Sequence, residues 1–152
     1  MMTIESLRDV QNNSELVLLC FENELKHFRG SSHERFPQGC CDIASTILIR
    51  ILNNEGFAHF KLIRGTNSEN AHHVWVESDK HIIDLTSHQF SQFKEPFILI
   101  DKNIYPLSRK PYYSVYEALD PYSVWPYLEI LEKEFTEVFF KKYLFKINLL
   151  LY

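Results

Sequence analysis

The period of the hydrophobic pattern changes from helical to strand-like at the polar segment 53–56. Before this segment, apolar residues recur three and four positions apart and predict one helix with an uninterrupted apolar stripe: Ile43, Ala44, Ile47, Leu48, Ile51 and Leu52. After it, the pattern predicts three strands and a further short one, over residues 57–64, 73–77, 81–85 and 97–100. The connections at 66–70 and 78–80 have the length of antiparallel hairpins. A central helix packed on an antiparallel sheet is an α+β arrangement.

The rest of the chain predicts further helices around this core. Residues 3–28 have a helical pattern that the polar segment 12–14 could divide into two helices. A C-terminal helix is expected over residues 127–143 or beyond. Because the sequence contains neither a linker nor an internal repeat, we expect a single domain over residues 1–152, with its core at about 36–100.

The composition and charge argue against several classes of protein. Hydrophobic residues make up 45% and charged residues 24% of the chain, so a disordered protein is not expected. The formal net charge of −4 and the lack of a Lys/Arg cluster argue against a nucleic-acid partner. Three lysines interrupt the apolar segment 135–152, so no membrane span is expected, and residues 1–10 lack the apolar run of a signal peptide. The expected location is cytoplasmic, with export by a signal-free route as the alternative.

The three cysteines, Cys20, Cys40 and Cys41, are too few for a disulfide framework. Cys20 lies in the apolar stripe of the first helix and is expected to be a buried structural thiol. Gly39-Cys40-Cys41 stands where the central helix begins, and the free N–H groups and dipole of a helix N-terminus favour a thiolate. Gly39 allows close approach of a substrate, and the Cys41 N–H and the Gln38 side chain are candidate donors to an oxyanion. The helix pattern alone does not choose between Cys40 and Cys41.

A histidine and an aspartate occur on the two predicted strands that follow. Strand alternation places His73 and Trp75 on one face, with Trp75 as a candidate wall of a substrate cleft. Asp84 interrupts an apolar run and therefore requires a polar partner or an exposed position. A hairpin with its turn at 78–80 would put Asp84 about opposite His73 or Val74, where the side chains could meet. A thiol, an imidazole and a carboxylate in this order could serve as nucleophile, base and orienting acid, although each also has a purely structural interpretation.

The histidines do not predict a metal site. They lack a compact pattern with a cysteine pair or an HExxH helix, and the candidates considered are His72, His73, His81 and His88. We therefore expect no metal and no other cofactor.

Three sequence blocks resemble, in their order, a bacterial papain-like/transglutaminase-like group of cysteine enzymes. Residues 36–45 (FPQGCCDIAS) match F-P-x-G-x-C-x-x-A-S, residues 73–75 (HVW) match H-x-W, and residues 83–90 (IDLTSHQF) match I-D-x-T-x-x-Q-F. The resemblance implies a papain-like α+β fold, in which a helix bearing the Cys packs on an antiparallel sheet bearing the His and the acid. It also implies Cys41, rather than Cys40, as the nucleophile. Asp42 stands where such proteins often have glycine, and a carboxylate there disfavours the thiolate.

The expected function is thiol-dependent acyl transfer through an acyl-enzyme, with Cys41 as nucleophile, His73 as base and Asp84 holding His73. With water as acceptor, the protein would be a cysteine peptidase, an amidase or a deamidase. With an amine as acceptor, it would be a transglutaminase or acyltransferase. A protein or peptide substrate is expected in each case. The alternative of another class is a non-catalytic protein-binding module that uses an aromatic cluster, namely Tyr112, Tyr113, Tyr116, Tyr122 and Trp125.

Overall fold

The computed structural model of this chain describes residues 3–28, 36–108, 113–123 and 128–144. Its helices are α1 (Ile4–Glu24), α2 (Cys41–Asn54) and α3 (Leu128–Val138). Its strands are β1 (Lys61–Thr66), β2 (His72–Glu77), β3 (His81–Asp84), β4 (Phe97–Asp101) and β5 (Val115–Leu119). Short 3-10 turns lie at Leu25–His27, Ser87–Gln89, Lys102–Ile104 and Pro106–Ser108, and a π-helical segment at Phe139–Leu144 continues α3. The predicted α+β class with an antiparallel sheet is confirmed.

The strands form one antiparallel sheet in the order β4-β3-β2-β1-β5. The strands β2 and β3 match the predicted ones to within one residue at each end. The edge strand β5 was not predicted, because its sequence VYEAL includes Glu and Ala, which are depleted in strands. Pairing with β1, for example of Ala118 with Ile63, holds this segment extended.

The first strand begins at Lys61, so the prediction that it starts at Phe57 was wrong. Turns that follow the end of α2 occupy the intervening residues. Gly56 has a φ of 94°, and the N–H of Phe57 donates to the carbonyl of Leu52 at 2.8 Å. These features close the helix with a turn before the strand can start.

The N-terminal helix is continuous, so the possible break at 12–14 does not occur. Thr3 caps α1 by accepting a hydrogen bond from the N–H of Ser6 at 3.0 Å. The Asn13 side chain donates to the carbonyl of Asp9 at 3.1 Å and, like Ser14, is buried. The asparagine is thus accommodated within the helix by a contact with the preceding turn.

Among the described residues, none of the helices combines the length and the apolar character that a membrane span requires.

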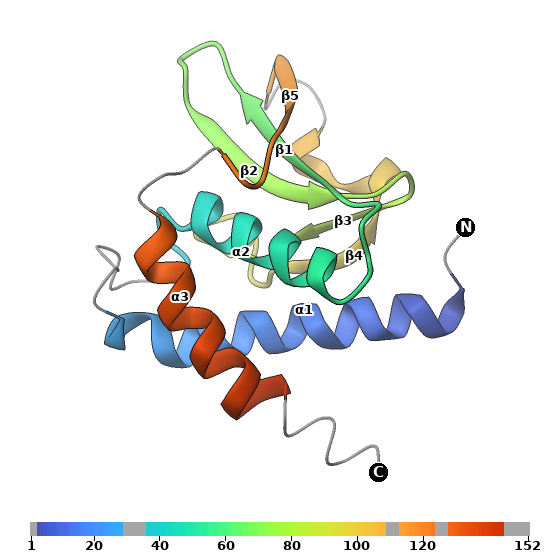
Figure 1. The fold of residues 1–152 in the computed structure, drawn as a ribbon. Coiled ribbons are helices and arrows are strands. Elements are labelled where there is room, and N and C mark those ends of the chain that lie inside the picture. The colour runs from blue at the N-terminus through green and yellow to red at the C-terminus, as the bar shows by residue number, and fades with distance from the viewer. Residues whose placement is uncertain (1–2, 29–35, 109–112, 124–127, 145–152) are drawn as a thin grey trace.

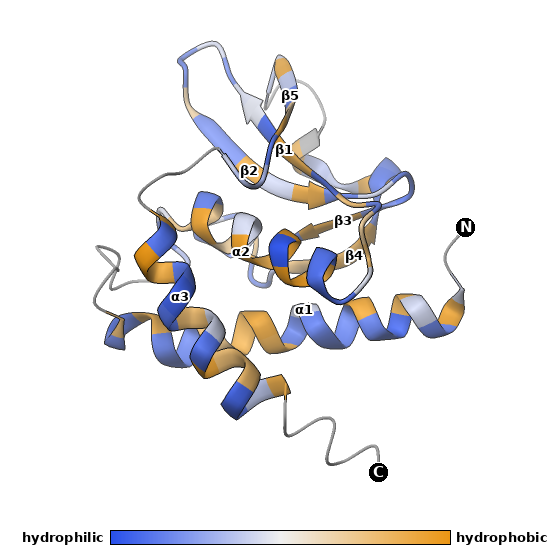
Figure 2. Ribbon diagram, in the orientation of Figure 1, coloured by the Kyte–Doolittle hydropathy of each residue, from blue (hydrophilic) through white to orange (hydrophobic). Residues whose placement is uncertain are grey.

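The helices cover one face of the sheet. Figure 1 shows α2 between the sheet and the pair α1 and α3. Hydrophobic and hydrophilic residues alternate along the turns of α1 and α3, as expected for helices with one buried side (Figure 2). The larger hydrophobic cluster fills this layer and includes Val74 and Val76 of β2 together with the whole apolar stripe of α2.

The opposite face of the sheet carries a second, mainly aromatic cluster. Its buried members are Ile63, Trp75, Ile82, Tyr105, Leu107 and Tyr113. Because side chains alternate along β2, His73 points to the side of Trp75, away from Val74. His73 therefore lies against the second cluster, whereas Cys41 packs on the first.

Candidate active site

Cys41 is the first residue of α2, and the loop before it is shaped by Gly39. Gly39 has a φ of 68°, in the left-handed region that a glycine adopts without strain. Cys40 is the N-cap residue, and its carbonyl accepts the first helical hydrogen bond, from the Ala44 N–H at 2.9 Å. Cys41 itself is partly exposed and packs against the larger hydrophobic cluster.

The other two thiols are buried. Cys40 is completely buried, and its sulfur contacts the Gln38 carbonyl at 3.3 Å. Burial, together with the nearby charges of Asp42 and Cys41, raises the pKa of the Cys40 thiol to about 12. Burial likewise raises the pKa of Cys20 to about 12, with a smaller contribution from Glu24. Both groups are therefore protonated and unreactive at neutral pH.

One oxygen of the Asp42 carboxylate accepts a hydrogen bond at the start of α2. Its Oδ1 lies 2.8 Å from the N–H of Ile43, in the first turn of α2. A carboxylate at this position interacts favourably with the helix dipole.

His73 and Asp84 form a buried pair. The distance from His73 Nε2 to Asp84 Oδ2 is 2.7 Å, and both side chains have zero exposure. The hairpin pairs Val76 with Ile83, and continuing this register by one residue places Asp84 opposite Trp75. The sequence placed Asp84 about opposite His73 or Val74, which was wrong by one or two positions. The actual register puts Asp84 on the same face as His73, so the carboxylate reaches the imidazole diagonally.

The Asp84 carboxylate has further donors that sequence reasoning missed. The Tyr105 hydroxyl, which is buried, donates to Oδ2 at 2.6 Å. Thr86 approaches Oδ1 with its backbone N–H at 3.1 Å and its hydroxyl at 3.5 Å. Thr86 belongs to the third sequence block, but nothing in the sequence singled out Tyr105 among eight tyrosines.

The surroundings of His73 change its acidity in opposing directions. Burial lowers the pKa of the imidazole, but the charge and hydrogen bond of Asp84 raise it, and a hydrogen bond and the charge of Cys41 raise it further. The net result raises the pKa of His73 to about 10. The structure thus pairs His73 with Asp84 by a hydrogen bond and places Cys41 near enough to affect the pKa of His73.

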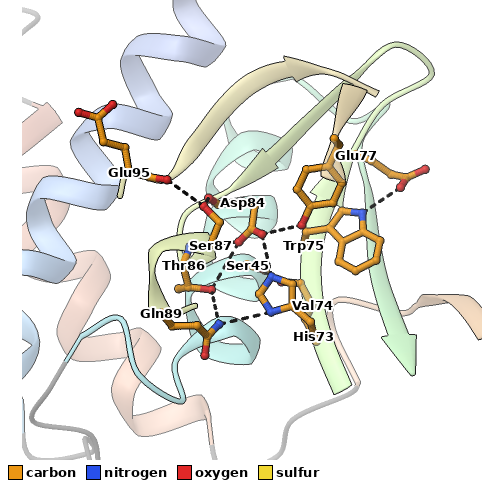
Figure 3. A network of polar contacts seen from close by, with 11 residues as sticks. Ser45, His73, Val74, Trp75, Glu77, Asp84, Thr86, Ser87, Gln89 and Glu95 are labelled. Atoms are coloured by element: carbon orange, nitrogen blue, oxygen red, sulfur yellow. Dashed lines mark hydrogen bonds and ion pairs between the residues drawn. The ribbon is translucent and has the colours of Figure 1, made fainter. Parts of the chain in front are cut away.

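Gln89 contacts the other ring nitrogen of His73. Its Nε2 lies 3.3 Å from Nδ1 and 3.2 Å from the Thr86 hydroxyl, so four side chains form a closed ring (Figure 3). The Gln38 side chain donates to the backbone carbonyl of Gln89 at 3.0 Å. One of the two N–H groups that made Gln38 a candidate oxyanion donor is therefore committed to holding the loop of Gln89.

The Trp75 ring packs near the His73 imidazole and is completely buried. Its ring centroid is 5.9 Å from that of His73, and its N–H donates to Glu77 at 3.0 Å. A β-carbon on Gly65 would lie 2.9 Å from atoms of Trp75 and Tyr113, so only glycine leaves room for both rings. Trp75 therefore supports His73 by packing and does not present its N–H to a cleft.

The expected aromatic cluster is divided in the structure. Tyr113 and Tyr116 pack on Trp75, with ring centroids 6.0 Å away in both cases. Tyr122 instead lies near the end of α2, where its hydroxyl is 3.2 Å from Asn53 Nδ2 and its ring is under the Arg50 guanidinium. Tyr112 and Trp125 lie outside the described residues.

The described part of the chain contains no group of three His, Cys, Asp or Glu residues that could hold a metal ion. His72, one of the candidate ligands, instead pairs through Nδ1 with the Thr66 hydroxyl at 2.8 Å.

We compared this chain with protein-family models, with curated proteins and with solved structures. None of the three comparisons finds a match.

Proposed function

We propose that this protein is a thiol-dependent acyl-transfer enzyme with a papain-like/transglutaminase-like fold, in which Cys41, His73 and Asp84 act together. The observation that carries the proposal is the buried His73–Asp84 pair at 2.7 Å, together with a partly exposed Cys41 at the start of α2 that raises the pKa of His73. A nucleophile, a base and a group that orients the base are the arrangement that covalent catalysis requires.

In the first half of the reaction, the Cys41 sulfur attacks the carbonyl carbon of an amide. Asp84 accepts a hydrogen bond from Nε2 of His73, so Nδ1, which Gln89 also contacts, exchanges the proton with Cys41 and with the leaving group. The backbone N–H of Cys41, at the helix start, is the candidate donor to the oxyanion. Collapse of the tetrahedral intermediate breaks the C–N bond, and the proton on Nδ1 goes to the departing amine. The product is a thioester on Cys41.

In the second half, an acceptor gives a proton to His73 and attacks the thioester. Water as acceptor releases a carboxylic acid and makes the enzyme a peptidase, amidase or deamidase. An amine as acceptor forms a new amide and makes it a transglutaminase or acyltransferase. In both cases, the proton on His73 returns to the Cys41 sulfur.

The first test is alkylation with iodoacetamide across pH, read by mass spectrometry of peptides. We expect one fast-reacting thiol, Cys41, because Cys20 and Cys40 are buried and protonated. The fast reaction should disappear in Cys41→Ala and slow at least about tenfold in His73→Ala, since the imidazole no longer stabilises the thiolate. Cys20→Ala is the matched control and should keep the fast reaction. Equal labelling of all three thiols would remove the case for an activated nucleophile.

The second test asks which acceptor is used. The protein is acylated with p-nitrophenyl acetate, and the acyl-enzyme is followed by intact mass with and without a biotinylated primary amine. Decay by water alone supports a hydrolase, whereas transfer of the acetyl group to the amine supports a transferase. If no acyl-enzyme forms on Cys41 although iodoacetamide labels it, the protein fits the non-catalytic binding module better.

A further inference from the structure

The Gln89 side chain contacts Nδ1 of His73, the ring nitrogen that the proposed mechanism uses. The hydrogen bonds of Thr86 determine which way the Gln89 amide is oriented. The Thr86 hydroxyl has one proton, which it directs to Asp84 Oδ1 at 3.5 Å. Its lone pairs can therefore accept a hydrogen bond, and Gln89 Nε2 lies 3.2 Å away. The amide nitrogen, and not its oxygen, consequently faces Thr86 and, at 3.3 Å, His73 Nδ1.

The ring of hydrogen bonds closes only for one form of the imidazole. Gln89 donates to Nδ1, so Nδ1 must carry a lone pair. Asp84 accepts at Nε2 at 2.7 Å, so Nε2 must carry the proton. Figure 3 shows the four side chains of the ring, His73, Asp84, Thr86 and Gln89, with the bonds between them. The arrangement matches the neutral Nε2–H tautomer of His73.

We propose that Gln89 is a positioning residue, which holds neutral His73 in the Nε2–H tautomer, so that Nδ1 is the ring nitrogen without a proton. When Nδ1 is protonated, two donors face each other across the same contact, so Gln89 opposes that state. The backbone of Gln89 is held by Gln38, three residues before Cys41, which couples this contact to the loop of the nucleophile.

This role counteracts the other groups around the imidazole. Asp84 from β3 and Cys41 from α2 raise the pKa of His73, while Tyr105 bonds Asp84 and Tyr113 stacks near the imidazole with its centroid 6.4 Å away. A base whose pKa lies far above the working pH gives up its proton slowly to a leaving amine. A neutral donor on Nδ1 makes this proton easier to release. The inference rests on the proposed function of His73 as the proton carrier of Cys41.

The test is a titration of the histidine side chains by two-dimensional 1H–15N NMR on the full-length protein, because the 15N shifts report the proton at each ring nitrogen. In wild type, neutral His73 should carry its proton on Nε2. In Gln89→Leu, the midpoint should rise by about 0.5 to 1 pH unit, as expected for the loss of one hydrogen bond to the neutral form. In Gln89→Glu it should rise further, since a carboxylate accepts from protonated Nδ1. Gln92→Leu, an exposed position on the same loop, should leave the midpoint unchanged.

An Nδ1–H tautomer in wild type, or an unchanged midpoint in both Gln89 variants, would overturn the inference. The NMR readout does not depend on catalysis. If Cys41 proves unreactive but the tautomer and the midpoints behave as expected, the proposed function fails and the role of Gln89 toward His73 stands.

Discussion

Asp84 is a fully buried carboxylate, and its hydrogen bonds explain how the chain tolerates it. Removing an ion from water costs several kcal/mol unless partners replace the hydration. His73 and Tyr105 bond Oδ2 and Thr86 bonds Oδ1, so both oxygens have donors. The loss of any one donor should leave part of a buried charge uncompensated.

The first prediction at the residue scale concerns Tyr105. Tyr105→Phe keeps the ring in the aromatic cluster but removes the 2.6 Å hydrogen bond to Asp84. We expect the free energy of unfolding to fall by about 1.5 to 3 kcal/mol, because this hydrogen bond reaches a charged acceptor. Denaturation with urea measures the change.

Tyr122→Phe is the matched control for this substitution. Tyr122 is 62% exposed, and its hydroxyl accepts a hydrogen bond from the Asn53 side chain at 3.2 Å on the surface. Its free energy of unfolding should change by less than about 0.5 kcal/mol. An equal loss of stability in the two variants would argue against a special contribution of Tyr105.

At the scale of elements, the site depends on how α2 is fixed to β2. Cys41 and Ser45 lie one turn apart on α2, and the Ser45 hydroxyl donates to the Val74 carbonyl at 3.0 Å in the buried interface. Val74 directly follows His73 on β2. This hydrogen bond therefore sets the position of the helix relative to the strand that carries the imidazole.

Ser45→Ala should lower the free energy of unfolding by about 0.5 to 1.5 kcal/mol through loss of this bond. It should also slow alkylation of Cys41, because the helix start can then shift relative to His73. The two effects are measured by urea denaturation and by the iodoacetamide rate. Unchanged alkylation together with lower stability would restrict Ser45 to a structural role.

The neighbouring residue supplies the control. The hydroxyl of Thr46 is buried and has no hydrogen-bond partner among the residues that the structure describes. Thr46→Val replaces it with a methyl group of similar shape, so stability should stay constant or rise. Both hydroxyls are buried, but only that of Ser45 has a hydrogen bond among the described residues. A loss of stability in Ser45→Ala alone would therefore come from the hydrogen bond and not from burial of a hydroxyl.

At the scale of the whole molecule, the sheet separates two hydrophobic clusters, and the candidate site joins them. Cys41 packs on the cluster under the helices, whereas His73 lies against Trp75 and Tyr113 on the opposite face. β2 pairs with β3 only at Val76 and Glu77. Because β3 ends at Asp84, the segment after it, which carries Gln89, lies beside His73 and completes the group.

The buried pair links global stability to pH. The pKa of His73 rises from its ordinary value of 6.5 to about 10 in the folded state, because Asp84 and Cys41 outweigh burial. A raised folded-state pKa means that the folded protein binds the proton more tightly, so this stabilisation is fully present below pH 6.5 and is lost as pH rises toward 10. The free energy of unfolding should fall over this window, with a slope of up to about 1.4 kcal/mol per pH unit from this group.

His73→Gln keeps a donor for Asp84 but does not titrate, so it isolates this effect. Urea denaturation of both proteins at several pH values gives the difference between their stabilities. That difference should shrink between pH 6.5 and 10. The raised pKa values of Cys20 and Cys40 act in both proteins and cancel. A difference that is constant over the window would contradict the linkage.

The sequence allowed much of the fold to be predicted, for physical reasons that are local. The helical stripe of 43–52 and the strands at 73–77 and 81–85 were evident, because amphipathic periodicity reflects burial on one side. The edge strand β5 was missed, because an exposed edge leaves no such pattern and its pairing with β1 is a long-range contact.

The candidate site divides in the same way. Spacing and alternation are properties of neighbouring residues, so the sequence predicted that a thiol begins a helix and that a histidine and an aspartate follow on paired strands. The tertiary structure alone decided that Cys40 is buried and Cys41 is not, and that Asp84 faces His73. It also brought in Tyr105, 21 residues beyond Asp84. The reason is that burial, and contacts between residues far apart in the sequence, depend on how the sheet twists and packs. A local sequence pattern does not contain this information.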